Sequence, residues 1–281
     1  MLIVRNSFSI EEDCHDIIAP FLSQRETISE ILENQKRLLT EIRSVKSLEE
    51  YNLAVDQHLA PYLQNAEKNY IENDKFILQE TMEFLEFATG DVKAAVYRAN
   101  YHNRPLFIKK LSPIKTNLNL LTEIQTSRIL ERLNIGPKTD LLYFKDNYYF
   151  IMEDINGINI KEVLYPENRG RYTKKSLDAI LGRVTLSIDE AVEVFTHSLL
   201  SQPQYLKRIK EIQKLLEQYQ FYHVDDFQFM IDLREGPSSI KVIDGEGFKR
   251  SDHSLSSPYG PENEVNRIFR DLRKIQELID D

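Results

Sequence analysis

The amino-acid sequence predicts an α+β protein, in which a helical N-terminal region comes before a small antiparallel sheet and a second helical region. Residues 10–72 carry apolar side chains at steps of three and four, the spacing of an amphipathic helix. Residues 82–152 form short aromatic and β-branched runs typical of strands, interrupted by one helical segment that begins near Asn117. Residues 176–222 and 262–280 return to helical spacing. A meander of strands with one inserted helix is a distinctive order of elements.

The overall composition is that of an acidic globular protein. The length of 281 residues suffices for one sizeable domain, or for a smaller domain with an extension. Hydrophobic residues make up 41% and charged residues 29%, which argues against wholesale disorder. The net charge of −9 argues against a nucleic-acid partner. The single cysteine cannot form an internal disulfide, which favours a reducing, intracellular location, and we expect no transmembrane segment because no long apolar run is present.

The N-terminal region contains three amphipathic runs whose role the sequence leaves open. Such helices could form a bundle, an arm that binds a partner, or a brace along the domain that follows. We favour the brace, because an apolar stripe at helical spacing is usually buried in a core. Pro20 lies inside the first run and Pro61 inside the third, so we expect the helices to be broken or bent there.

Turn residues divide the central region into five short strands. Gly90-Asp91 and His102-Asn103 separate the first three strands, and Lys145-Asp146-Asn147 separates the last two. The strands are expected at residues 83–90, 92–101, 104–111, 138–144 and 148–152.

Residues 223–248 hold the cluster of acids around which the chain is organised. The apolar pair Met230-Ile231 and the apolar run 240–243 flank a polar turn, which predicts a small hairpin. Asp225 comes before the first strand and Asp244 after the second, so we expect both carboxylates at the same end of the hairpin. Two acids placed there could hold a divalent metal ion and orient a hydroxyl group, which is the chemistry that phosphoryl transfer needs.

The order of these acidic motifs resembles that of the protein-kinase-like superfamily. His223-Val224-Asp225 is similar to the start of the H-R-D-L-x-x-x-N catalytic loop, and Asp244-Gly245-Glu246 stands where the D-F-G metal site would follow. The Asp-x-Glu form looks more like small-molecule kinases of the aminoglycoside and choline phosphotransferase type. The resemblance implies a two-lobed protein-kinase-like fold, with a helical N-terminal extension at 1–75, an N-lobe at 76–155 and a shortened, helical C-lobe at 156–281.

Further residues match positions of the same family, and the resemblance implies their roles. Lys109, in the strand L-F-I-K-K, is similar to the V-A-I-K lysine that reaches the α and β phosphates of ATP. Glu123 on the following helix would be its ion-pair partner, because a lysine on the inner face of a strand needs an anion. Met152 would be the gatekeeper, and backbone groups of Glu153 and Ile155 in the hinge would hydrogen-bond adenine.

Two departures from the family's pattern bear on activity. Met230 stands where the family has an Asn that binds a second magnesium ion, and a thioether is a poor ligand for magnesium. One magnesium ion would have to suffice, or Asp226, Gln228 or Glu246 would have to replace the Asn. The glycine-rich loop that covers the phosphates keeps only Gly90, which puts tight binding of the phosphates in doubt.

We therefore expect an ATP- and Mg²⁺-dependent phosphotransferase, whose acceptor is a protein or small-molecule hydroxyl. In it, Asp225 accepts or orients the hydroxyl and Asp244 holds the metal. The alternative is a catalytically dead pseudokinase that acts as a protein-binding or scaffold module. A third possibility is a helical scaffold joined to an unrelated α+β domain.

The remaining expectations concern location and a basic loop. Truncated kinase-like domains are similar to effectors secreted by pathogenic bacteria, so a cytoplasmic location or delivery into a host cell is expected. The loop 169–175 carries Arg169, Arg171, Lys174 and Lys175. It could contact phosphate groups, an anionic substrate or a membrane surface, but a solvated loop is favoured.

Overall fold

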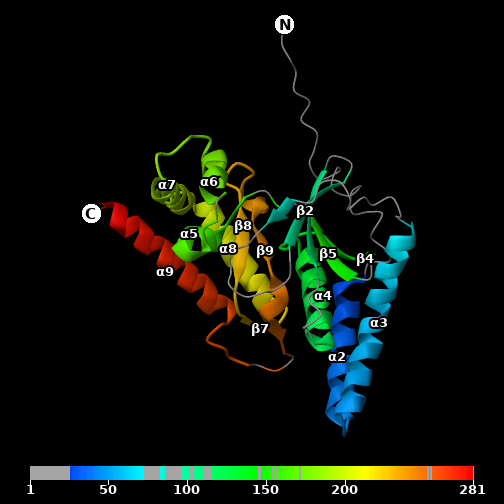
Figure 1. The fold of residues 1–281 in the computed structure, drawn as a ribbon. Helices are drawn as coiled ribbons and strands as arrows, with labels where there is room; N and C mark the ends of the chain where they lie inside the picture. Colours follow the sequence, from blue (N-terminus) through cyan, green and yellow to red (C-terminus); the bar gives the residue numbers. More distant parts are fainter. Residues whose placement is uncertain are drawn as a thin grey trace. The chain divides into compact units, whose positions relative to one another are not determined.

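The computed structural model describes residues 26–72, 83–85, 96–101, 104–110, 116–144, 147–153, 155, 157–170, 172–251, 253 and 255–280. Helices and antiparallel strand pairs make up most of these residues, so the chain is an α+β protein, as the sequence predicts (Figure 1). The chain divides into two compact units. The described residues up to 118 and residues 138–153 belong to the first, and residues 119–137 and those from 155 onward belong to the second.

A helical hairpin of α2 (Ile28–Ser44) and α3 (Leu48–Glu72) opens the first unit. His58 of α3 is buried, and its ring nitrogens lie 2.5 Å from the side-chain oxygen of Asn34 and 2.9 Å from the carboxylate of Glu41, both on α2. This polar link fixes the register of the two helices, because a buried ring nitrogen without a partner would be costly.

Helix α3 continues through Pro61, so of the two expectations for this residue the break is wrong, and the bend stays a prediction. A proline inside a helix costs about 3 kcal/mol, because it removes one backbone donor and its ring crowds the preceding turn. Burial of apolar side chains on both sides of the proline offsets that cost. The buried apolar residues in the described part of α3 are Ala54, Val55, Leu59, Tyr62 and Ala66. Pro20 lies outside the described residues.

Within the described residues, the sheet of the first unit has five strands in the order β1-β2-β3-β5-β4, all paired antiparallel. Helix α3 packs against β4, at one edge of this sheet. The described parts of the strands agree with the prediction, and residues 86–95, which include the expected end of the first strand and start of the second, lie outside the described part. Their bounds are β1 (Glu83–Leu85), β2 (Val96–Tyr101), β3 (Arg104–Lys110), β4 (Thr139–Phe144) and β5 (Asn147–Glu153).

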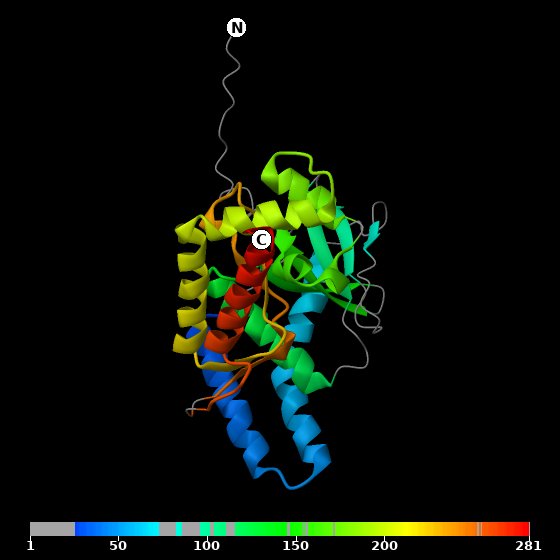
Figure 2. The same ribbon diagram turned by 90° about the vertical axis from the view of Figure 1, so that its left-hand side faces the viewer.

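The second unit is mainly helical (Figure 2). Its described residues also form two small antiparallel sheets, β6-β8-β9 and β10-β7. None of the helices in the described ranges is long and apolar enough to cross a membrane. The helices are α4 (Asn117–Arg132, of which 119–132 lie in this unit), α5 (Ile160–Leu164), α6 (Thr173–Leu181), α7 (Ile188–Leu200), α8 (Pro203–Gln218) and α9 (Pro261–Asp280). The strands are β6 (Ile158–Asn159), β7 (Phe221–Val224), β8 (Gln228–Ile231), β9 (Lys241–Ile243) and β10 (Phe248–Arg250).

An aromatic core lies beneath the acidic hairpin. The rings of Phe221 and Phe248 are 5.9 Å apart, Phe227 lies 5.9 Å from Phe229, and Phe227 lies 6.2 Å from Phe248, measured between centroids. Each of these side chains is at most 2% exposed. The sequence predicts a helix through residue 222, but α8 ends at Gln218 and β7 follows, because the core needs Phe221 on a strand that pairs with β10.

Candidate functional site

The two key carboxylates lie at the same end of the hairpin, as the sequence predicts. Strands β8 and β9 pair antiparallel, with Gln228 opposite Ile243 (Figure 1). Asp225 lies just before the first of these strands, and Asp244 directly follows the second. Both side chains are exposed to solvent. The hairpin therefore presents two carboxylates at one edge.

The backbone of both acidic loops is tightly curved. Asp225 and Asp226 form a turn in which the Asp225 carboxylate accepts a hydrogen bond of 2.9 Å from the Asp226 N–H. Asp226 and Asp244 both adopt left-handed backbone conformations, with φ of 59° and 57°. Aspartate tolerates this conformation better than most residues other than glycine. These turns direct three acidic side chains outward from the ends of short strands.

Two glycines allow the acidic loops to pack closely. A Cβ atom on Gly247 would lie 2.8 Å from the backbone carbonyl oxygen of Asp225. A Cβ atom on Gly245 would lie 2.7 Å from a methyl carbon of Thr126 on α4. Any side chain at these positions would push the segment after Asp244 away from its neighbours. The Gly-x-Gly spacing therefore fixes where Asp244 lies relative to Asp225.

His223 is positioned by the segment that precedes α9. Its Nδ1 lies 2.9 Å from the hydroxyl of Ser257, and its ring packs edge-on against Tyr259 at 5.3 Å between centroids. The N–H of Val224 donates to the carbonyl oxygen of Tyr259 over 2.7 Å. The histidine therefore holds the strand before Asp225 in place.

Lys161 is a residue of this site that sequence reasoning missed. It lies on α5, its side chain is 18% exposed, and its ammonium forms an ion pair with the carboxylate of Asp226. Burial is the main cause that lowers the pKa of Lys161, and the positive charge of Arg267 acts in the same direction. The carboxylates of Asp244, Glu264 and Asp225 oppose this shift. A half-buried lysine among several acids is thus placed to neutralise negative charge.

Helix α9 adds a second ion pair to the site. Glu264 is 3% exposed and accepts a hydrogen bond of 2.5 Å from the Arg267 guanidinium. Burial raises the pKa of Glu264, and Asp225 raises it further, whereas Arg267 and Lys161 lower it. We call the six residues that influence one another here the charged cluster: Lys161, Asp225, Asp226, Asp244, Glu264 and Arg267.

The charged cluster offers few oxygen ligands for a metal ion. In the described part of the chain, no group of three or more His, Cys, Asp and Glu side chains is arranged to hold one. Magnesium in phosphate-binding sites commonly uses one or two protein carboxylates together with phosphate oxygens and water. Asp244 and Asp225 fit that smaller requirement, because both are exposed and lie at the same end of the hairpin. Met230, on β8, contributes no oxygen ligand from its side chain.

The predicted nucleotide-binding residues fall in both units. Lys109 of β3 is half-buried and lies opposite Val96 and Phe150, while its neighbour Ile108 is fully buried, which is the predicted alternation. Glu123 of α4 is 4% exposed and belongs to the second unit. A pair between Lys109 and Glu123 stays a prediction.

The predicted hinge coincides with the passage from one unit to the other. The first unit ends at Asp154 and the second resumes at Ile155. The N–H of Glu153 donates to the carbonyl oxygen of Lys138 over 3.0 Å. An adenine contact at Glu153 would therefore have to use its carbonyl oxygen. The loop around Gly90 lies outside the described residues.

Two of the four cations between residues 169 and 175 form ion pairs within the protein. Arg169 contacts Asp189 at 2.7 Å, and Lys174 contacts Asp178 at 2.6 Å. Helix α6 begins at Thr173, so Lys174 and Lys175 are helical rather than part of a loop, and Arg171 lies outside the described residues.

No protein-family model matches the chain, and no curated protein matches it significantly.

Proposed function

We propose that the chain is an ATP- and Mg²⁺-dependent phosphotransferase of the protein-kinase-like kind, with a protein or small-molecule hydroxyl as acceptor. The observation that supports this function best is the placement of Asp225 and Asp244 at one end of the β8–β9 hairpin, next to Lys161. Phosphoryl transfer depends mainly on positioning and on neutralisation of charge, rather than on covalent chemistry by the protein. An edge with two exposed acids and a nearby cation meets both needs.

Each residue then has a distinct task. Asp225 orients the acceptor hydroxyl and takes its proton, and Asp244 holds magnesium. When bound, the metal ion would neutralise charge on the phosphate oxygens. Lys109, supported by Glu123, binds the α and β phosphates, and the hinge at Glu153 and Ile155 holds the base.

Lys161 is a positioning residue in this proposal. Its ion pair with Asp226 holds the turn that carries Asp225, and its charge offsets repulsion between Asp225 and Asp244. The segment H-V-D-D-F, residues 223–227, contains no lysine or arginine, so the cation comes from α5.

A pseudokinase that binds partners is the second candidate function. Two observations favour it: Met230 occupies the position of a magnesium-binding Asn, and the described residues hold no group of three metal-binding side chains. In that case nucleotide would be a structural ligand, or would not bind.

A radiolabel transfer assay distinguishes these functions. Purified protein is incubated with γ-labelled ATP and Mg²⁺, and label is followed into the chain itself, into a mixed protein acceptor and into small-molecule alcohols. Asp225→Asn and Asp244→Asn should lower transfer by roughly 10²- to 10⁴-fold, as loss of a general base or charge-stabilising group commonly does. Asp189→Asn, which removes an exposed carboxylate elsewhere in the second unit, should leave transfer unchanged.

The outcome decides between the two candidates. All three variants should unfold at the same urea concentration as the wild type. A loss of phosphoryl transfer then results from the change at the site and not from unfolding. Transfer that survives both Asn substitutions would place the chemistry elsewhere. No transfer by the wild-type protein, together with nucleotide binding, would support the pseudokinase.

A further inference from the structure

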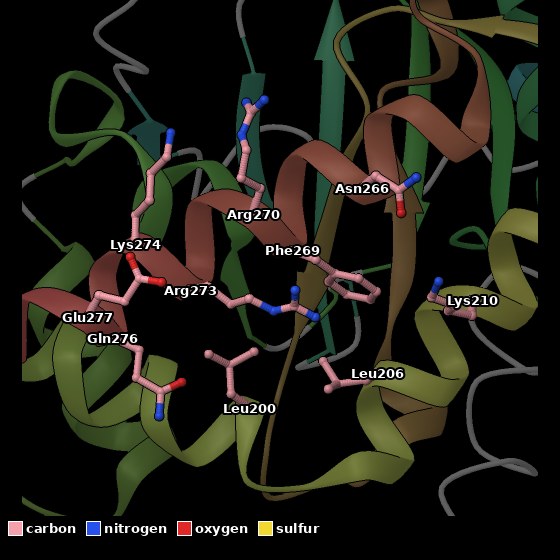
Figure 3. Close-up of a pocket in the computed structure, with 10 residues that line it drawn as sticks. All are labelled: Leu200, Leu206, Lys210, Asn266, Phe269, Arg270, Arg273, Lys274, Gln276 and Glu277. Carbon is pink, nitrogen blue, oxygen red and sulfur yellow. The ribbon is translucent and has the colours of Figure 1, made fainter. Parts of the chain in front are cut away.

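A groove of about 870 Å³ lies between helices α8 and α9 in the second unit, and none of its lining residues belongs to the charged cluster (Figure 3). The last residue of α7 contributes to one side. The residues that line the groove are Leu200, Leu206, Lys210, Asn266, Phe269, Arg270, Arg273, Lys274, Gln276 and Glu277. None of these residues has a part in the proposed phosphoryl transfer.

Apolar side chains from three helices form part of the groove. Leu200 comes from α7, Leu206 from α8 and Phe269 from α9. The two leucines are half-buried, whereas Phe269 is 8% exposed. Figure 3 shows the Arg273 side chain extending from α9 toward these leucines. The groove therefore offers apolar surface next to a positive charge.

The rest of the lining is strongly basic. The lining contains four cations and one carboxylate: Lys210, Arg270, Arg273 and Lys274, with Glu277. This excess of positive charge is local, because the whole chain has a net charge of −9. An acidic protein that gathers four cations along one groove has a surface suited to a negatively charged ligand.

The four cations differ in the contacts that they make within the protein. Arg270 and Lys274 both contact the carboxylate of Asp271, at 3.1 and 3.2 Å. Lys210 lies 5.7 Å from the centroid of the Phe269 ring, a cation–π contact. Within the described ranges, no carboxylate lies at ion-pair distance from Lys210 or Arg273. These two cations are the best placed to bind an external anion.

We propose that this groove binds an acidic, amphipathic peptide segment of a partner protein. Bulky apolar side chains of the segment pack against Leu200, Leu206 and Phe269, while its carboxylates pair with Lys210 and Arg273. An amphipathic helix laid into a groove between two helices is a common mode of peptide recognition. A concave apolar surface with basic groups suits such a segment better than it suits a flat membrane, which binds protruding apolar side chains.

Fluorescence anisotropy with a defined peptide tests the proposal on the full chain. The probe is a labelled helical peptide of about 15 residues, built from Glu, Ala and Leu with the leucines on one face. Lys210→Glu and Arg273→Glu should each weaken binding by at least about tenfold, since each replaces an attraction by a repulsion. Lys207→Glu is the matched control, because Lys207 lies on α8, is 79% exposed and does not line the groove. It should change binding by less than about threefold, through long-range charge alone.

Changes to the peptide separate the two parts of the proposed contact. Replacing the leucines by serine, or the glutamates by glutamine, should each reduce binding by at least about tenfold, because both kinds of contact are needed. Circular dichroism and urea unfolding should show that the three protein variants are folded like the wild type.

Three results would overturn the proposal. The first is no peptide binding at about millimolar protein, the weakest range of useful affinity. The second is equal binding of the serine peptide, which would indicate a general anion site. The third is binding of phosphatidylserine vesicles that Lys210→Glu and Arg273→Glu abolish while peptide binding is unaffected, which would indicate a membrane surface.

Discussion

At the scale of single residues, Gly247 shows how closely the two acidic loops approach. It follows Asp244 by three positions, and a methyl group there would lie 2.8 Å from the Asp225 carbonyl oxygen. Since the obstructing atom belongs to the backbone, it cannot move aside by a side-chain rotation. The position of the proposed metal ligand therefore depends on a residue that bears no functional group.

We expect Gly247→Ala to lower the free energy of unfolding by about 1–3 kcal/mol, the usual cost of overpacking. The measurement is urea unfolding followed by circular dichroism. Gly170→Ala is the control, because no atom lies within 4 Å of a Cβ added at Gly170. It should change stability little, or raise it by about 0.5 kcal/mol through the unfolded state. Equal effects of the two substitutions would contradict the close approach.

At the scale of secondary-structure elements, Asp178 fixes the connection between α6 and α7. Its carboxylate accepts hydrogen bonds from the N–H and hydroxyl of Thr185, at 3.0 and 2.7 Å, and from the Lys174 ammonium at 2.6 Å. These bonds, with that from Lys174 the largest cause, lower the pKa of Asp178 from 3.8 to about 2. The charged form is thus favoured in the folded state.

This shift sets the sign of a pH effect. Because the folded pKa is the lower one, Asp178 stabilises the fold above about pH 4, and that contribution is lost as the pH falls toward about 2. We expect Asp178→Asn to unfold at lower urea concentration than the wild type near neutral pH, with a difference that shrinks between about pH 4 and 2. Urea titrations at several pH values measure it, and Glu235→Gln, at an exposed carboxylate, is the control. If the difference stays constant over this pH interval, the charge of the Asp178 carboxylate does not contribute to the stability of the fold.

At the scale of the whole molecule, bound nucleotide should stabilise the protein. Any ligand that binds only the folded state raises the free energy of unfolding, by about 2.7 kcal/mol at 100 times its dissociation constant. For a chain of this length we expect ATP with Mg²⁺ to raise the thermal midpoint by about 5 °C or more. The shift should disappear in Lys109→Ala and lose its magnesium dependence in Asp244→Ala.

Thermal unfolding with and without the two ligands makes this measurement. Lys36→Ala removes an exposed lysine of α2 and should keep the full shift. An unchanged midpoint for the wild type at millimolar ATP would count against both the phosphotransferase and a nucleotide-binding pseudokinase. Attention would then move to a scaffold function and to the groove between α8 and α9.

Sequence patterns alone determined most of the elements. Period-2 and helical spacings predicted the five-strand sheet, the helix that starts at Asn117 and the final helix, because these signals are local. The polar turn between two apolar runs likewise predicted that Asp225 and Asp244 end at the same side of a hairpin. Local spacing could not show that α3 would continue through Pro61, since burial by distant residues outweighs the local cost.

Only the tertiary structure decided which charges surround that hairpin. Lys161, Glu264 and Arg267 belong to helices that are distant in sequence from Asp225, and each looks like an ordinary charge on an amphipathic helix. The basic groove likewise depends on packing, because its apolar residues come from three helices and its cations from two of them, α8 and α9. Ion pairs and grooves are set by long-range packing, which has no period along the chain. The order of residues along the chain therefore determined the acidic hairpin, and the tertiary packing determined which cations lie next to it.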